Sequence, residues 1–242
     1  MFQYRTLILA GLTAVLLAVG GAASASAIIA SSPTAFNAAL GAGQTQAVDF
    51  GNTALQTGSG SGSQNGNSFS WTGGSDGRSG VYAASAGLVS GIAAPPAALT
   101  SGHFFAATGG GALDLTLAKA ATSMSVYIGS LDSFNTITFD EQDGSSQSFT
   151  GTELAALVPT SADGDQSSGQ TNRRFYFNFG GKAVDKVVFA SNGNSFEFTD
   201  IAFGFPGVSG VPEPQAWMML ILGVGMTGFA VRRRSAGAPL AA

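Results

Sequence analysis

The sequence predicts an all-β fold, a jelly-roll-like β-sandwich, with an N-terminal signal peptide and a C-terminal transmembrane helix. Three observations favour this fold class. Phenylalanine is abundant, with 18 residues, while charged residues make up only 10% of the chain. Apolar and polar side chains alternate in several segments, which is the pattern of a strand with one buried face. Runs rich in Gly, Ser, Asn and Thr separate these segments, as turns do.

The alternation locates the individual strands. It is clearest at Leu113–Leu117, Ser123–Ile128 and Arg174–Phe179. Further strands are predicted at Ala47–Phe50, Phe69–Trp71, His103–Ala106, Thr136–Asp140, Gln147–Thr150, Lys186–Ala190 and Ser195–Phe203. The turn signals Asp143-Gly144 and Asn192-Gly193 fall between neighbouring strands. About nine or ten short strands in one domain predict a β-sandwich.

The last predicted strand changes phase along its length. Phe196 and Phe198 share one parity, whereas Ile201 and Phe203 share the other. A one-residue slip would turn half of the strand inside out, and a β-bulge at Thr199-Asp200 corrects it. Two interpretations follow: a bulge within a core strand, or a bulge that also directs Asp200 to bind a cation or to cap a turn.

Two segments are predicted to contain helix. They are Thr34–Leu40 and Thr152–Leu157, the second capped by Thr152. Gln56–Gly80 is predicted to be flexible because Gly, Ser, Asn and Gln crowd there, although its aromatic residues pin part of it to the core. Ser161–Asn172 is predicted to be a second long polar loop.

The C-terminal region combines a proline break, an uncharged apolar segment and a basic cluster. Pro212 and Pro214 prevent a helix from extending backwards. Residues 216–231 carry no charge, and a helix of roughly sixteen residues spans about 24 Å, slightly short of the ~30 Å of a bilayer core. Trp217 suits one interface, and Arg232, Arg233 and Arg234 form a cytoplasmic stop at the other. Residues 236–242 are then a short cytoplasmic tail.

The N-terminal region predicts export by a signal peptide, residues 1–27. Arg5 supplies the positive charge and Thr6–Val19 the apolar region. Ala25 and Ala27 form a small-x-small cleavage site, so that the mature chain begins at Ile28. An uncleaved N-terminal anchor is the alternative. The chain before Pro212 is expected to face away from the cytoplasm.

These C-terminal residues resemble a known protein-sorting signal. Val211, Pro212, Glu213, Pro214 and Trp217, followed by a glycine-containing apolar segment and the arginines, are similar to the PEP-CTERM signal in its PEPxxWA variant. Met218 stands where that variant usually has alanine. The resemblance covers residues 211–235. It implies processing by exosortase, a transpeptidase of the inner membrane of Gram-negative bacteria, with Pro212-Glu213-Pro214 as the recognised motif. It also implies association with exopolysaccharide or the cell surface.

The region between the two signals, residues 28–210, is expected to be one sandwich domain. Its basic residues are far fewer than its acidic ones, which leaves a net charge of about −7 at neutral pH by sequence count. Such a domain would repel phosphate, so a nucleic-acid partner is not expected. The chain has no cysteine, which excludes disulfides, zinc–thiolate sites and a thiol nucleophile.

No catalytic site is predicted. Gly73-Gly74-Ser75-Asp76-Gly77 matches GxSxG, but that motif needs a preceding strand and a following helix, whereas this one lies in a Gly/Ser-rich loop. The single histidine, His103, lies in an apolar segment and is expected to be structural. Paired carboxylates of a glycosidase cannot be nominated from the sequence.

Calcium and glycan sites stay open. No cofactor is predicted, but the acidic segments Asp140–Gly144 and Asp163–Asp165 offer oxygen ligands that calcium accepts, without EF-hand spacing. A sugar-stacking platform of Trp71, Tyr82, Tyr127 and Tyr176 is the alternative to ordinary cross-strand packing.

The leading hypothesis is an exported, non-enzymatic, surface- or exopolysaccharide-associated protein with a structural or adhesive role. Its partners are an exosortase-like membrane enzyme, the inner membrane through residues 216–231 and exopolysaccharide. Two alternatives come from other classes of protein: a secreted polysaccharide-active hydrolase, and a calcium-stabilised carbohydrate-binding module. The sequence does not determine the glycan or the oligomeric state.

Overall fold

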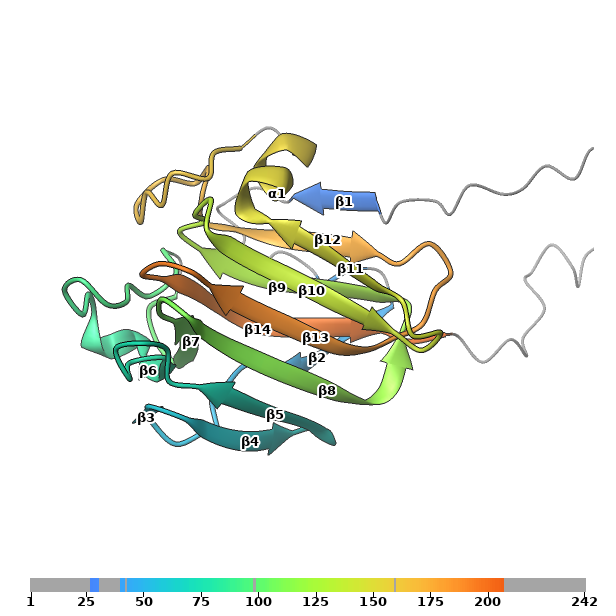
Figure 1. Ribbon diagram of the computed structural model, residues 1–242, viewed down its shortest axis with the longest axis horizontal. Coiled ribbons are helices and arrows are strands. Elements are labelled where there is room, and N and C mark those ends of the chain that lie inside the picture. Colours follow the sequence, from blue (N-terminus) through green and yellow to red (C-terminus); the bar gives the residue numbers. More distant parts are fainter. Residues whose placement is uncertain (1–26, 31–39, 42, 98, 159, 207–242) are drawn as a thin grey trace, which may run out of the picture.

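Two antiparallel sheets lie face to face in the computed structural model, which describes residues 27–30, 40–41, 43–97, 99–158 and 160–206 (Figure 1). The side chains of residues 27–30 are not described. The all-β class and the sandwich of two antiparallel sheets are therefore confirmed. Residues 1–26 of the predicted signal peptide, the sorting residues 211–235 and the tail lie outside the described residues, whereas Ala27 is the first residue of β1.

The first sheet has eight strands and carries the candidate site. Its order is β1 (Ala27–Ala30), β12 (Arg173–Asn178), β9 (Ser123–Gly129), β14 (Phe196–Gly204), β7 (His103–Ala107), β6 (Gly80–Ala83) and β3 (Gln56–Thr57), and β2 (Gln44–Val48) also pairs with β14. The second sheet has six strands. Its order is β11 (Ser146–Thr150), β10 (Asn135–Glu141), β13 (Val184–Ser191), β8 (Gly111–Ala121), β5 (Asn67–Thr72) and β4 (Gly60–Gln64).

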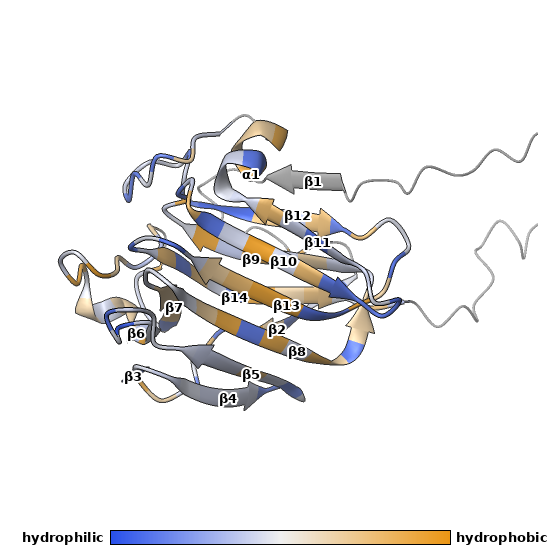
Figure 2. Ribbon diagram, in the orientation of Figure 1, coloured by the Kyte–Doolittle hydropathy of each residue, from blue (hydrophilic) through white to orange (hydrophobic). Residues whose placement is uncertain are grey.

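The core between the sheets is rich in phenylalanine. Alternation along β8 buries Leu113 and Leu115, and Figure 2 shows apolar and polar bands following one another on this strand. From the facing sheet, Phe198 lies with its ring centroid 4.2 Å from that of Phe189 of β13. Stacked and edge-on aromatic pairs add to the stabilisation that apolar burial gives. Because the chain has no cysteine, no disulfide adds to this packing.

The described residues form fourteen strands, more than the nine or ten expected. Every predicted strand is present, but β1, β3, β4 and β6 were not predicted. The expectation that Gln56–Gly80 is flexible is wrong for the stretch that holds β3, β4 and β5. A Cβ at Gly60 or Gly62 would come within 2.3 or 2.7 Å of the rings of Trp71 and Phe69. Glycine is therefore required in β4, because the aromatic rings of β5 lie across it.

The predicted helix near residue 152 is present as α1 (Gly151–Leu157), but its cap differs from the prediction. Thr150, not Thr152, is the N-cap. Its hydroxyl accepts a hydrogen bond from the backbone N–H of Glu153, whose carboxylate accepts one from the N–H of Thr150. This capping box satisfies two donors that a helix start otherwise leaves free. Residues 34–39 of the other predicted helix lie outside the described part.

A second, smaller apolar cluster lies on the outer face of the first sheet. Phe104 and Ala106 of β7 face outward there, and the loop between β6 and β7 covers them with Ala93 and Leu99. This loop begins with a short 3-10 turn, η1 (Ala84–Ala86). The outer face near β7 is therefore buried, and polar groups beneath the loop are desolvated.

The two ends of the sandwich domain lie at the same end of the first sheet. The register aligns Ala27 with Asn178, Asn178 with Ser123, and Ser123 with Gly204. Ala27 and Gly204 are thus three strand spacings apart, about 14 Å at ~4.8 Å each. The segments that precede β1 and follow β14 are attached at this common end.

No helix within the described ranges combines the length and apolar character needed to cross a membrane. The predicted span, residues 216–231, falls after residue 206 and was not part of that search.

Candidate functional site

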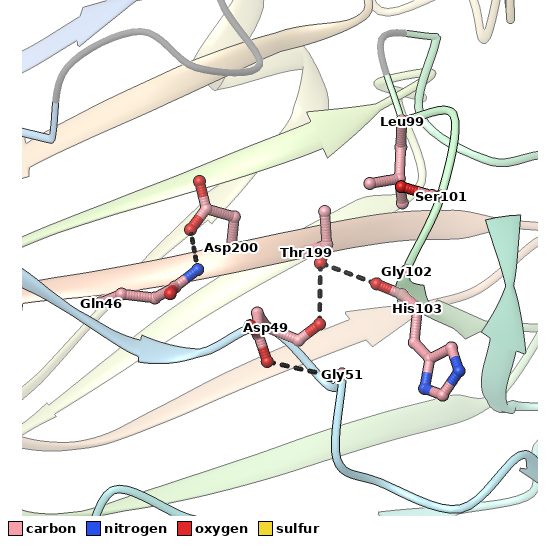
Figure 3. Close-up of a pocket in the computed structure, with 9 residues that line it drawn as sticks. All are labelled: Gln46, Asp49, Gly51, Leu99, Ser101, Gly102, His103, Thr199 and Asp200. Atoms are coloured by element: carbon pink, nitrogen blue, oxygen red, sulfur yellow. Dashed lines mark hydrogen bonds between the residues drawn. The ribbon is translucent and has the colours of Figure 1, made fainter.

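A pocket of about 200 Å³ opens where the first sheet is interrupted (Figure 3). One edge of β14 pairs with β7 through Phe196–Phe198 and with β2 through Ile201–Gly204. Thr199 and Asp200 lie between these two pairings and line the pocket together with residues from the end of β2 and the start of β7. Bulges commonly occur beside binding sites, because they redirect a side chain and open the ladder.

The predicted bulge at Thr199-Asp200 is confirmed. Against β9, the register of β14 shifts between Thr199 and Ala202, and Asp200 has a φ of 51°. This left-handed conformation keeps Phe198 and Ile201 in the core on both sides of the slip. Phe50, next to two pocket residues, also has a positive φ, 60°, which is unusual for a bulky residue. Its buried ring packs against Phe69, Phe105 and Phe198 and so holds this backbone in place.

The bulge directs Asp200 toward a buried guanidinium. Arg174 of β12 is fully buried, and its Nη2 is ion-paired with Oδ2 of Asp200. Its Nη1 donates to the carbonyl oxygen of Asp200 and to the hydroxyl of Ser125, both at 3.0 Å. Gln46 of β2 donates its amide to Oδ1 of Asp200 at 2.6 Å. The cation that Asp200 binds is therefore an arginine of this chain, and burial lowers the pKa of that arginine.

The remaining polar groups of the pocket connect β14 to β7, and the segment after β2 to β4. Thr199 donates its hydroxyl to the carbonyl oxygen of His103 at 2.9 Å. Oδ1 of Asp49 accepts from the N–H of Gly51 at 2.8 Å and from the amide of Gln64 at 2.6 Å. These bonds fix the pocket walls before any ligand arrives.

Ser75 and His103 are not brought together. Nδ1 of His103 lies 2.9 Å from the carbonyl oxygen of Phe50. The Ser75 hydroxyl donates to the carbonyl oxygen of Gly109, beyond the other end of β7. Five residues of strand at ~3.3 Å each separate the two sites by about 17 Å. The GxSxG segment forms a loop. The hydroxyl of Thr108 donates a hydrogen bond to Oδ1 of Asp76 at 2.6 Å, which holds this loop and lowers the pKa of Asp76.

The acidic side chains of the two predicted calcium segments form ion pairs with one lysine and hydrogen bonds within turns. Glu141 and Asp143 are both ion-paired with Lys182 beside the turn between β10 and β11. Oδ1 of Asp165 accepts from the N–H groups of Ser167 and Ser168, at 2.9 and 3.1 Å. Within the described part of the chain, no cluster of three or more His, Asp or Glu residues could hold a metal ion.

The four aromatic residues of the suggested glycan platform do not form one surface. Trp71 belongs to the core between the sheets, and Tyr127 is fully buried. Tyr82 and Tyr176 are half-buried, on β6 and β12. Four strand spacings separate these strands, about 19 Å at ~4.8 Å each. A single sugar ring cannot span that distance.

A buried glutamate, Glu197, was not predicted from the sequence. Glu197 of β14 is 1% exposed and accepts hydrogen bonds from the N–H of Ala94 at 3.0 Å and from the hydroxyls of Ser130 and Ser195. It thereby holds the loop between β6 and β7. Burial raises the pKa of Glu197. Burial, and then the charges of Glu197 and Asp163, raise the pKa of half-buried Asp132 to about 7. The alternation of β14 predicts that Glu197 faces solvent, away from the core. Nothing in the sequence indicates that the loop between β6 and β7 covers it.

We expect Asp132→Asn to raise the melting temperature more at pH 8 than at pH 4.5. The raised pKa means that Asp132 favours the folded state when protonated, and that this contribution is lost as the pH rises from about 4 to about 7. Asparagine resembles the protonated acid. The gain at pH 8 is on the order of 1 kcal/mol, because the side chain is half exposed and screened.

The opposite control is Asp165→Asn, since hydrogen bonds from Ser167 lower the pKa of Asp165. That variant should lose stability at pH 8. An increase in the melting temperature of Asp132→Asn that is equal at pH 4.5 and pH 8 would contradict the raised pKa of Asp132.

Asp200→Asn should lower the free energy of unfolding by about 3 kcal/mol, because it removes the negative charge that is ion-paired with the buried Arg174. Asparagine tolerates the left-handed backbone, so the substitution tests the charge and not the bulge. The matched control is Asp114→Asn, whose partner Lys186 is half-exposed, with an expected loss below about 1 kcal/mol. Urea unfolding, followed by the fluorescence of buried Trp71, measures both, and equal losses would contradict the account.

The comparisons with known proteins concern the segment after the sandwich. No curated protein matches the chain. A family model described as the PEP-CTERM protein-sorting motif matches residues 210–234, shortly after β14 ends at Gly204. PEP-CTERM signals are processed by exosortase, a membrane enzyme, and they imply export and a membrane-anchored precursor. The resemblance inferred from the sequence is thereby confirmed: the chain carries a PEP-CTERM sorting signal downstream of its β-sandwich.

Proposed function

We propose that this chain is a non-enzymatic protein of the cell surface or exopolysaccharide, with a structural or adhesive role. The observation that carries the proposal is the PEP-CTERM match at residues 210–234, placed after the β-sandwich. In this proposal the sandwich, of jelly-roll-like connectivity, is the exported part. From β7 to β10 the chain crosses between the sheets at each connection, which supports that connectivity.

The precursor is held in the inner membrane by residues 216–231, with Arg232–Arg234 on the cytoplasmic side. Exosortase acts near Pro212-Glu213-Pro214 and releases the domain to the surface or the extracellular matrix. Signal-peptide cleavage after Ala27 would leave Ile28–Ala30 paired with β12. The common position of Ala27 and Gly204 supports this arrangement, because one end of a folded domain can then face the membrane.

A non-enzymatic role is supported by how the chemically competent side chains are engaged. Ser75 and His103 lie at opposite ends of β7. Asp200 is ion-paired with Arg174, and Glu141 and Asp143 share an ion pair with Lys182. These groups form hydrogen bonds and ion pairs that hold loops and strands together.

Processing predicts a secreted or surface form that lacks Trp217–Ala242, because exosortase would remove the apolar helix. Mass spectrometry of the intact protein from the producing cell measures this. Pro212→Ala combined with Pro214→Ala should retain the tail and keep the protein in the membrane fraction. Pro206→Ala, outside the matched range, is the control and should be processed normally.

An intact Trp217–Ala242 tail on all of the wild-type surface protein would overturn the proposal. Normal processing of the double proline variant would remove the assigned role of Pro212 and Pro214.

A further inference from the structure

The pocket beside the β14 bulge has the size of a site for one small ring. Its volume, about 200 Å³, is below the ~300 Å³ at which pockets for drug-sized ligands begin. Gly51 and Gly102 contribute no side chains to its lining, and Figure 3 shows the His103 ring directed away from Asp200. The entrance is therefore not narrowed by bulky side chains at these positions.

The pocket offers hydrogen-bond acceptors. Oδ1 of Asp49 is engaged by Gly51 and Gln64, but within the described chain Oδ2 has no protein donor. Gln46 donates its amide to Asp200, which leaves its own side-chain oxygen as an acceptor. The exposed Ser101 hydroxyl has no partner among the described residues. A ligand with several hydroxyl donors matches these groups.

One wall of the pocket is apolar. Leu99 lines it and is otherwise packed into the cluster of Phe104 and Ala93. A sugar ring has the matching character, with hydroxyls at its edge and C–H groups on its face. An apolar wall beside a few placed polar groups is the usual composition of a small-molecule site.

Asp49 and Asp200 are held in place by hydrogen bonds and an ion pair, which reduces the entropy lost on binding. Arg174 and Gln46 hold Asp200 from two directions. Thr199 joins β14 to the carbonyl oxygen of His103. Gln46, His103, Thr199 and Asp200 line the pocket from three strands of the sheet. Asp49, Leu99 and Ser101 lie in the segments that follow β2 and precede β7.

From these observations we propose that the pocket binds a single sugar residue of a surface glycan, with Asp49 and Ser101 contacting its hydroxyls and Leu99 its ring face. The choice of a sugar rests on the proposed function, which places the sandwich among extracellular polysaccharides. The site gives the domain an adhesive contact that the sorting motif itself does not supply.

Saturation-transfer NMR on the full chain in detergent micelles tests the site. The probes are the methyl glycosides of glucose, galactose, mannose and N-acetylglucosamine. At least one should show saturation transfer. Ser101→Trp fills the pocket from an exposed position and should abolish that signal. Asp49→Asn should weaken binding at least tenfold, a loss of about 1.4 kcal/mol.

The matched control is Ser70→Trp, an exposed substitution in the shallow groove on the outer face of β5, which should leave binding unchanged. Thermal melts show whether Asp49→Asn remains folded. If Asp49→Asn is unfolded, the saturation transfer measured for Ser101→Trp alone tests the site. No transfer from any of the four glycosides, or unchanged transfer in Ser101→Trp, would overturn the assignment. Removal of the C-terminal tail in cells is measured separately, so failure of the pocket and failure of sorting give different results.

Discussion

The β-bulge in β14 is the constraint on which the first sheet depends. The strand must bury Phe196 and Phe198 on one side of the slip, and Ile201 and Phe203 on the other. A single left-handed residue, Asp200, makes both possible. The same residue neutralises Arg174 of β12, so that a fully buried guanidinium has an ionic partner. Because β2 and β7 meet β14 on either side of the bulge, the pocket exists for the same reason.

Strands with large alternating side chains could be predicted from the sequence, because their periodicity reflects burial directly. β8, β9 and β12 are of this kind, and the phase slip located the bulge. β4 could not be predicted in this way, since its inner face consists of Gly60 and Gly62 and is completed by Trp71 and Phe69 of another strand. The cap of α1 was misassigned, although Thr150 and Glu153 have the spacing of a capping box.

The candidate site was only partly predictable, because a sequence does not show which strands become neighbours. Asp200 was identified from the strand phase alone. Its partner Arg174, and the buried Glu197, lie on strand positions that alternation assigns to solvent. The loop after β6 covers Glu197, and Arg174 is buried where it contacts Ser125 of β9 and Asp200 of the bulge. The sorting signal, by contrast, is a local sequence motif and could be recognised without knowledge of the tertiary structure.

We propose that the sandwich lies outside the cytoplasm while its sorting signal is processed at the membrane. The chain contains no cysteine, so a single Ser63→Cys on exposed strand β4 gives one defined thiol. Labelling with a membrane-impermeant maleimide in intact spheroplasts measures its side of the membrane directly. We expect labelling equal to that after lysis. Labelling that occurs only after lysis would contradict the account.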